Sequence, residues 1–176
     1  MTPERTVLGI ESSCDETAVA ILRHHQGQEG DEIEVLASEI SSQIDIHREF
    51  GGVVPELASR NHSLHLRPLI VVALEDAKLS IDDIDAFGAT AGPGLASSLL
   101  VGNTTAKSLS IATGKPFISV NHMEGHLLSP FLHQKTLSPN LALIVSGGHT
   151  LLIHMKGFGD YTLIGSTRDD AAGEAY

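Results

Sequence analysis

Two histidines that lie four residues apart could bind one metal ion. They are His122 and His126 in the segment His-Met-Glu-Gly-His, and Asn121 before them is a good helix N-cap. On a helix, side chains four residues apart project from the same face, so both imidazoles could reach a single cation. Neutral imidazole suits zinc or iron(II), and such centres usually add a carboxylate and keep open coordination positions. A pair of helix-surface histidines that binds nothing is the open alternative.

The carboxylate inside this segment is not placed as it is in zinc peptidases. Glu124 follows His122 by two positions, whereas in H-E-x-x-H the glutamate directly follows the first histidine and acts as general base. The Glu124 side chain should therefore project from another face of the helix. The spacing offers two metal ligands without the peptidase base.

Two polar turns between apolar strands could bind the remaining parts of a substrate. The turn at 11–17 crowds the carboxylates of Glu11, Asp15 and Glu16 together with three hydroxyl groups. The turn at 146–150 (SGGHT) contains glycines, which let backbone N–H groups approach an anion closely. Facing each other across a cleft, the two turns would suit the phosphates of a nucleotide and its metal. Taken singly, each could be an ordinary hairpin turn.

Other side chains with possible chemistry give weaker signals. Cys14 should be a poor nucleophile, because neighbouring carboxylates raise the pKa of a thiol. Ser12 and Ser13 have no histidine nearby in the sequence, which argues against a serine hydrolase. Histidines and arginines at 47–48 and 60–65 could form a basic patch, although a solvated helix face is the simpler interpretation.

Apolar and β-branched segments predict the elements that position these residues. We expect strands at 5–10, 17–22, 34–40, 84–90 and 117–120, with a turn-like segment at 24–32. We expect helices at 55–77, 95–112 and from 121 to about 133, and Pro68 should kink or split the first of them. This order of elements is typical of a mixed sheet whose helices form right-handed crossovers.

After residue 140 the pattern of the N-terminal strands begins again. Strands are expected at 141–145, 150–155 and 161–165, followed by a helix that starts at Ala171. We interpret this as an internal repeat, with a first lobe at 1–137 and the start of a second lobe at 138–176. A meander of three strands needs a cover for its apolar face, so the second lobe should be poorly protected in isolation.

The composition excludes several classes of protein. The formal net charge of −11 makes the chain a poor general nucleic-acid binder, so an RNA would need local basic patches or a partner subunit. No apolar run approaches the roughly 20 residues of a membrane helix, and the N-terminus lacks the pattern of a secretory signal. Cys14 is the single cysteine and cannot form an internal disulfide. We therefore expect a cytoplasmic protein without a membrane partner.

Five motifs occur in the order known from one protein family. They are GIESSCDET at 9–17, GGVVPELASR at 51–60, AGPGL at 91–95, VNHMEGH at 120–126 and VSGGHT at 145–150. Together they closely resemble the tRNA threonylcarbamoyladenosine transferase family (TsaD type), long labelled O-sialoglycoprotein endopeptidase, in its bacterial form. The resemblance covers essentially the whole chain.

The resemblance implies a fold and a reaction. The fold would be α/β, a duplicated ribonuclease-H-like fold as in actin and sugar kinases, with a complete first lobe and a truncated second lobe. The enzyme would be an acyltransferase in tRNA modification. It would move the threonylcarbamoyl group from threonylcarbamoyl-adenylate to the exocyclic amine of the adenosine beside the anticodon, in tRNAs that read codons beginning with A. This segment alone should be inactive.

The resemblance also implies roles for particular residues and partners. His122 and His126 would bind the metal, one Fe²⁺ per subunit or alternatively Zn²⁺, and Asp15 and Glu16 would be the catalytic candidates. The threonylcarbamoyl-adenylate site would be lined by five consecutive residues, Val145, Ser146, Gly147, Gly148 and His149. The implied partners are tRNA, a paralogous dimerisation subunit and a small ATPase.

Departures from the family pattern leave other functions open. Ile144 stands where archaeal relatives place a tyrosine ligand, and a third metal ligand, an aspartate, is expected only after Tyr176. An ATP-dependent kinase or ATPase of the actin-like class would need a complete adenosine-binding lobe and would leave the histidine pair without a purpose. A metalloprotease is disfavoured by the position of Glu124. A non-catalytic scaffold is disfavoured because family partners of that kind lack the H-x-E-G-H segment.

Overall fold

The computed structural model describes residues 4–27, 30–134 and 136–173. The chain divides into two compact units, Met1–Glu124 and Gly125–Tyr176, and each is described here by itself. The boundary falls inside helix α4 (His122–Leu128). The predicted division into lobes at 137 and 138 stays a prediction.

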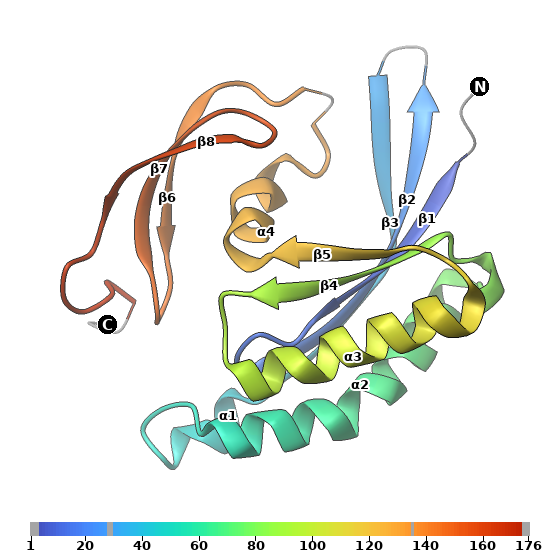
Figure 1. Ribbon diagram of the computed structural model, residues 1–176, viewed down its shortest axis with the longest axis horizontal. Coiled ribbons are helices and arrows are strands. Elements are labelled where there is room, and N and C mark those ends of the chain that lie inside the picture. Colours follow the sequence, from blue (N-terminus) through green and yellow to red (C-terminus); the bar gives the residue numbers. More distant parts are fainter. Residues whose placement is uncertain (1–3, 28–29, 135, 174–176) are drawn as a thin grey trace. The chain divides into compact units, whose positions relative to one another are not determined.

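The first unit is built on a mixed sheet with helices on one side (Figure 1). Its strand order is β3-β2-β1-β4-β5, antiparallel from β3 to β1 and parallel from β1 through β4 to β5. The elements in chain order are β1 (Arg5–Glu11), β2 (Glu16–Gly27), β3 (Gly30–Ser42), α1 (Ile44–Arg48), α2 (Pro55–Ala77), a 3-10 helix (Ile81–Asp83), β4 (Ala86–Gly92), α3 (Ala96–Thr113) and β5 (Phe117–Asn121). The predicted mixed sheet is confirmed.

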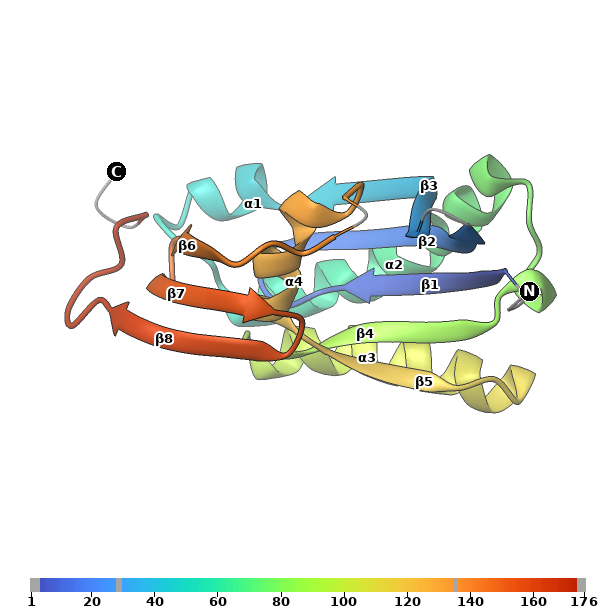
Figure 2. The ribbon, with the colours of Figure 1, turned by 90° about the horizontal axis from the view of Figure 1, so that it is seen from above.

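The core of the first unit lies between this sheet and helices α2 and α3, which cover the same face (Figure 2). Leu8 is paired with Ile21 on one side and with Phe87 on the other, and all three side chains are fully buried in the resulting cluster. Because side chains alternate along a strand, residues next to these core positions project from the opposite face. Glu11, which follows the core residue Ile10 on β1, and Thr90, which follows the core residue Ala89 on β4, are two such residues.

The parallel strands bring their carboxyl ends to one edge of the sheet. β1 ends at Glu11, β4 at Gly92 and β5 at Asn121, so the acidic turn, the A-G-P-G loop and α4 all follow strands at this edge. In α/β proteins ligands bind beyond the carboxyl ends of the strands. The sheet therefore positions three of the predicted motifs together.

One prediction about the first unit is wrong, and one of the two effects predicted for Pro68 does not occur. The hairpin strands extend through most of 24–32, because β2 and β3 stay paired as far as Gly27 and Gly30. His25 also contacts Glu34 on the neighbouring strand (Nε2–Oε2, 3.2 Å) and Glu4 ahead of β1 (Nδ1–Oε1, 3.0 Å). Residues 28 and 29 of that segment lie outside the described residues.

Pro68 does not split α2, which runs unbroken from Pro55 to Ala77. Pro68 and Leu64, whose carbonyl loses its helical partner, are both exposed, so water can satisfy that carbonyl.

The second unit contains the other predicted meander. After the rest of α4 and a 3-10 helix (Ser129–Phe131) come β6 (Asn140–Val145), β7 (Thr150–Gly157) and β8 (Asp160–Ser166), antiparallel in the order β6-β7-β8. Helix α4 ends earlier than predicted, at Leu128 ahead of Pro130. The predicted helix start at Ala171 is wrong for residues 171–173, because Ala171 has no regular secondary structure and residues 172 and 173 form a turn. The remainder of that helix lies outside the described residues.

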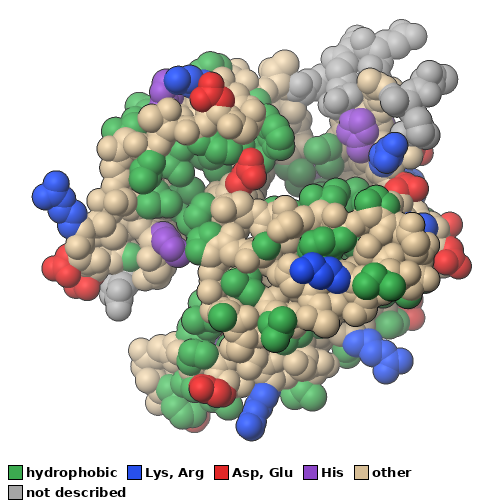
Figure 3. All heavy atoms as spheres, in the orientation of Figure 1, with side chains coloured by type: hydrophobic (Ala, Val, Ile, Leu, Met, Phe, Trp, Pro, Cys, Tyr) green, Lys and Arg blue, Asp and Glu red, His purple; other side chains and the backbone are tan. Residues whose placement is uncertain are grey.

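We expect the amides of β6 to β8 to exchange with solvent much faster than those of β1 and β4. Hydrophobic side chains reach the surface over these strands (Figure 3), and Leu141 and Leu143 are each 65% exposed. Strands without a packed cover open easily, which exposes their amides. Native-state hydrogen exchange of the chain measures this, with β4 as the internal reference. Equal protection in both sheets would contradict the expectation.

Among the residues that the structure describes, no helix is both long and apolar enough to cross a membrane.

Candidate functional site

The histidine pair lies on a helix that starts directly at the end of β5. The Asn121 side-chain oxygen accepts hydrogen bonds from the backbone N–H groups of Met123 (2.9 Å) and Glu124 (3.2 Å). Asn121 is therefore the N-cap that the sequence predicts, and it fixes His122 as the first residue of α4. His126 follows one turn later on the same helix.

His122 contacts the acidic turn through two residues of that turn. Its Nδ1 atom lies 3.2 Å from the Ser13 hydroxyl oxygen and 3.4 Å from Glu11 Oε2. The contact follows from the fold, because Glu11 ends β1 and His122 begins directly after β5 at the same edge of the sheet. The sequence analysis counted Glu11 among the carboxylates of the turn, but the resemblance singled out only Asp15 and Glu16 as catalytic candidates. The expected parallel strands at 5–10 and 117–120 would have placed Glu11 and His122 at the same edge of the sheet, and this signal could have identified the contact.

Hydrogen bonds hold the Glu11 carboxyl group in its ionised form. It accepts hydrogen bonds from the Ser13 backbone N–H and from the Thr90 hydroxyl group. Burial raises the pKa of Glu11, but the bonds with His122, Ser13 and Thr90 lower it by more, from 4.5 to about 2. The carboxylate is thus negative at neutral pH, which favours a cation at this edge of the sheet.

The serine and the histidine of this site do not form a hydrolase triad. The sequence placed no histidine near Ser13, yet in the fold the Ser13 hydroxyl lies within hydrogen-bonding distance of His122. In a triad the serine and the carboxylate contact opposite nitrogens of the imidazole. Here Ser13 and Glu11 both face Nδ1, so this geometry argues against a serine hydrolase.

The A-G-P-G loop packs helix α3 tightly against the acidic turn. The Leu95 N–H donates to the Ser13 carbonyl (2.8 Å), and the Ser12 hydroxyl donates to the Ser98 carbonyl (2.8 Å) and accepts from the Gly102 N–H (3.1 Å). A Cβ atom on Gly94 would lie 2.7 Å from the Ser13 carbonyl oxygen, closer than real Cβ contacts. Glycine at 94 is therefore what allows the loop to reach the turn.

We expect Gly94→Ala to lower the free energy of unfolding by about 1 to 3 kcal/mol, the usual cost of overpacking. The added methyl group would meet backbone, so the acidic turn or α3 must move. Urea denaturation measures the change. Gly52→Ala is the matched control, because nothing lies within 4 Å of a Cβ atom there. Equal stability of the two variants would contradict this packing.

A buried histidine on α2 holds the other side of the acidic turn. His62 Nε2 donates to the Cys14 carbonyl (3.0 Å), while Nδ1 accepts from the Thr17 hydroxyl (2.8 Å) and the Gln43 amide (3.3 Å). Burial lowers the pKa of His62. His62 and His47 are both buried, so the suggested basic patch does not include them.

Cys14 in this turn is a poor nucleophile, as predicted. Burial and the charges of Asp15 and Glu11 raise the pKa of its thiol to about 11. The turn therefore presents carboxylates rather than a reactive thiolate at neutral pH.

The glycine turn of the second unit is closed by its flanking residues. The Ser146 N–H donates to the His149 carbonyl (2.8 Å), and the His149 N–H donates to the Ser146 hydroxyl (3.0 Å). Open space surrounds the Cβ positions of Gly147 and Gly148. The tight turn is confirmed.

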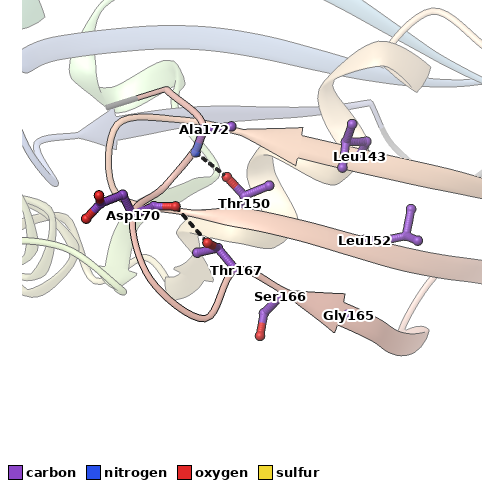
Figure 4. A pocket seen from close by; sticks show the side chains of 8 residues that line it. All are labelled: Leu143, Thr150, Leu152, Gly165, Ser166, Thr167, Asp170 and Ala172. Atoms are coloured by element: carbon purple, nitrogen blue, oxygen red, sulfur yellow. Dashed lines mark hydrogen bonds between the residues drawn. The ribbon is translucent and has the colours of Figure 1, made fainter. Parts of the chain in front are cut away.

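An open cavity of about 350 Å³ lies beside this turn in the second unit (Figure 4). Thr150 accepts a hydrogen bond from the Ala172 N–H (2.8 Å), and the Thr167 hydroxyl donates to the Asp170 carbonyl (2.7 Å), which folds the last described segment back along the sheet. The lining residues are Leu143, Thr150, Leu152, Gly165, Ser166, Thr167, Asp170 and Ala172. The predicted substrate residues 145–149 lie between Leu143 and Thr150 in the chain, and their role stays a prediction.

The metal role predicted for His122 and His126 stays a prediction. No group of three or more His, Cys, Asp or Glu within 4–27, 30–134 and 136–173 is placed to hold an ion. His122 and His126 nevertheless fit such a centre, because metal-bound histidines almost always give their other ring N–H to a carboxylate or a carbonyl. His122 has the Glu11 carboxylate beside Nδ1. This contact supports a ligand role for His122, and further ligands would have to complete the coordination shell.

The fold resembles solved structures of the ribonuclease-H-like and actin-like class. YeaZ from Pseudomonas aeruginosa matches with a TM-score of 0.59 and 20% identity, over 93% of this chain and 66% of that one. The PPX-GPPA enzyme of Aquifex aeolicus matches with a TM-score of 0.52 and 12% identity, over 94% of this chain and 52% of that one. The fold therefore defines an α/β protein of this class.

Sequence comparison identifies the family within that class. The family described as TsaD, tRNA N6-adenosine threonylcarbamoyltransferase, matches residues 34–176. Relatives with that name in Clostridium novyi (strain NT) and Clostridium beijerinckii are each 51% identical, over 100% and 98% of this chain but 50% and 49% of their own length. The chain belongs to the TsaD family. It spans about half the length of these curated relatives.

Proposed function

We propose that this chain serves in the transfer of a threonylcarbamoyl group from threonylcarbamoyl-adenylate to the exocyclic amine of an adenosine in tRNA. The observation that carries the proposal is the placement of the His122 imidazole beside an ionised carboxylate at the carboxyl ends of β1, β4 and β5, in a chain of the TsaD family. A metalloprotease or a serine hydrolase would need a base or a triad that this site does not form.

His122 and His126 would hold an Fe²⁺ ion, or alternatively Zn²⁺, together with ligands from outside the described residues. When bound, such an ion supplies a Lewis acid and a template for the oxygens of the adenylate. Glu11 balances the positive charge of the ion. Hydrogen bonds from the Ser13 backbone N–H and the Thr90 hydroxyl hold the Glu11 carboxylate in place.

The remaining steps fall to the carboxylates and the glycine turn of this chain. The amine nitrogen forms a bond to the carbamoyl carbon, the bond from that carbon to the phosphate oxygen breaks, and AMP leaves with the bonding electrons. Asp15 or Glu16 takes the proton that the amine loses. The backbone around residues 145–149 binds the adenylate. Because the anhydride is already activated, positioning supplies most of the catalysis.

The charge of the chain supports a role for partner subunits in binding tRNA. A formal net charge of −11 opposes a polyanion, so basic surface has to come from elsewhere in the assembly. We propose a paralogous dimerisation subunit and a small ATPase as these partners, and the cytoplasm as the compartment.

A chimera tests the proposed function. This chain would replace the matching half of the Clostridium novyi relative, in cells that lack their own enzyme and carry the partner proteins of that species. Mass spectrometry of digested tRNA should detect threonylcarbamoyladenosine with the chimera and none when the replaced half is simply deleted. The 176-residue chain alone should show no turnover. A folded chimera that leaves the tRNA unmodified would contradict the proposal.

A further inference from the structure

The segment that follows β8 folds back onto the glycine turn of the second unit, and hydrogen bonds hold it there (Figure 4). The Thr167 N–H donates to the Thr150 carbonyl (2.9 Å), and the Ala172 N–H donates to the Thr150 hydroxyl (2.8 Å). The Thr167 hydroxyl also donates to the Asp170 carbonyl (2.7 Å), and Ala171 is buried. The segment is therefore fixed beside the residue at which the turn ends.

Gly173 brings the backbone of this segment against the turn. A Cβ atom on Gly173 would lie 2.5 Å from both the carbon and the oxygen of the Ser146 carbonyl, and 2.9 Å from the Gly147 nitrogen. These three atoms belong to one peptide group, so none of them is the movable end of a side chain. The φ angle of Gly173 lies outside the left-handed region, so its backbone conformation suits any residue. The close approach to this peptide group is therefore what requires glycine at 173.

The peptide group that Gly173 contacts carries an unused hydrogen-bond donor of the turn. The turn itself is closed by the N–H groups of Ser146 and His149. The N–H groups of Gly147 and Gly148 donate to no acceptor in the described part of the chain, and both glycines are exposed. Because a peptide group is planar, fixing its carbonyl also fixes the direction of its N–H. Gly173 thus determines where the Gly147 N–H points.

We propose that Gly173 is a positioning residue that directs the Gly147 N–H toward the phosphate of threonylcarbamoyl-adenylate. The inference rests on the proposed function, in which the backbone around residues 145–149 binds the adenylate. Gly173 offers no side chain to the ligand and acts through the peptide group that it contacts. Backbone N–H groups bind an anion when neighbouring amides point to one place, so a displaced peptide group loses its share of the binding.

Gly173→Ala in the Clostridium novyi chimera tests the inference through the kinetics of transfer. The added methyl group would meet backbone, so the peptide group of the turn or the segment must move. We expect the KM for threonylcarbamoyl-adenylate to rise about 10- to 100-fold, the effect of losing one hydrogen bond to a charged group. The kcat should stay within about 2-fold of the unsubstituted chimera, because a bond made equally in the ground state and the transition state contributes to binding alone.

Two further variants separate positioning from overpacking. Gly157→Ala is the matched control and should leave the KM unchanged, because Gly157 ends β7 far from the turn and nothing lies within 4 Å of a Cβ atom there. Thr150→Val removes the hydroxyl that holds Ala172 and adds no atom between the segment and the turn. It should raise the KM about 3- to 10-fold, the effect of losing one neutral hydrogen bond. If Gly173→Ala does not fold, Thr150→Val decides the question, and an unchanged KM then overturns the inference.

The outcomes distinguish this inference from the proposed function. If the unsubstituted chimera modifies tRNA and Gly173→Ala matches Gly157→Ala in KM, Gly173 does not position the turn and the inference alone is overturned. The same conclusion holds if Gly173→Ala lowers only the free energy of unfolding, as urea denaturation measures. If the unsubstituted chimera folds and leaves the tRNA unmodified, the proposed function fails and the inference fails with it. A raised KM at unchanged kcat in Gly173→Ala supports the inference.

Discussion

Phe87→Ala should lower the free energy of unfolding of the chain by about 3 to 5 kcal/mol, the usual cost of removing a buried phenylalanine ring. Phe87 is fully buried at the centre of the first unit. It is paired with Leu8 on β1 and with Phe117 on β5, so it joins the two parallel strand pairs. The alanine would lose the contacts of the ring and leave a cavity beneath α2 and α3.

Phe158→Ala is the matched control for this substitution. Phe158 is 76% exposed between β7 and β8, and surface substitutions usually change stability by less than about 0.5 kcal/mol. Urea denaturation followed by circular dichroism measures both variants. A loss below about 1 kcal/mol for Phe87→Ala would show that the core does not depend on this ring.

His62→Ala should cost about 3 kcal/mol of unfolding free energy. The substitution leaves a cavity and removes the partner of the Cys14 carbonyl, the Thr17 hydroxyl and the Gln43 amide, all within a buried network. His65→Ala is the control, because His65 lies one turn further along α2 and is exposed. Equal effects of the two substitutions would contradict the network.

The same histidine should make stability depend on pH. Burial lowers the pKa of His62 below its ordinary value of 6.5, so the unfolded chain binds a proton on this group at a higher pH than the folded chain does. The stabilising contribution is complete above about pH 7.5 and is lost as the pH falls through 6.5 toward the folded pKa. The stability of the wild type relative to His62→Ala should therefore shrink over this range, as urea denaturation at a series of pH values would measure.

Local patterns were sufficient to predict most of the elements. Alternating and β-branched apolar residues gave the strands, Gly114 ended α3 in the left-handed conformation, and Asn121 capped α4. The histidine pair was also predictable, because a spacing of four residues is a local property of a helix. These features need no knowledge of distant parts of the chain.

The contacts around His122 could not be predicted from local sequence patterns. Glu11 and His122 are 111 positions apart, and their meeting depends on the parallel register of β1, β4 and β5. His62 was assigned to a solvated face because polar residues usually lie there, yet a buried network of backbone and side-chain partners holds it. Both errors arise where tertiary contacts override a local preference.

The central claim is that the histidine pair binds the metal of a threonylcarbamoyl transferase. The most direct test measures metal content and tRNA modification together in the Clostridium novyi chimera, with and without His122→Ala and His126→Ala. The account predicts that the double variant loses both the bound metal and at least 99% of the modification, as the loss of two ligands requires. His133→Ala, which removes another exposed histidine, should retain both. A folded double variant that keeps its metal and modifies tRNA at the wild-type rate would contradict the account.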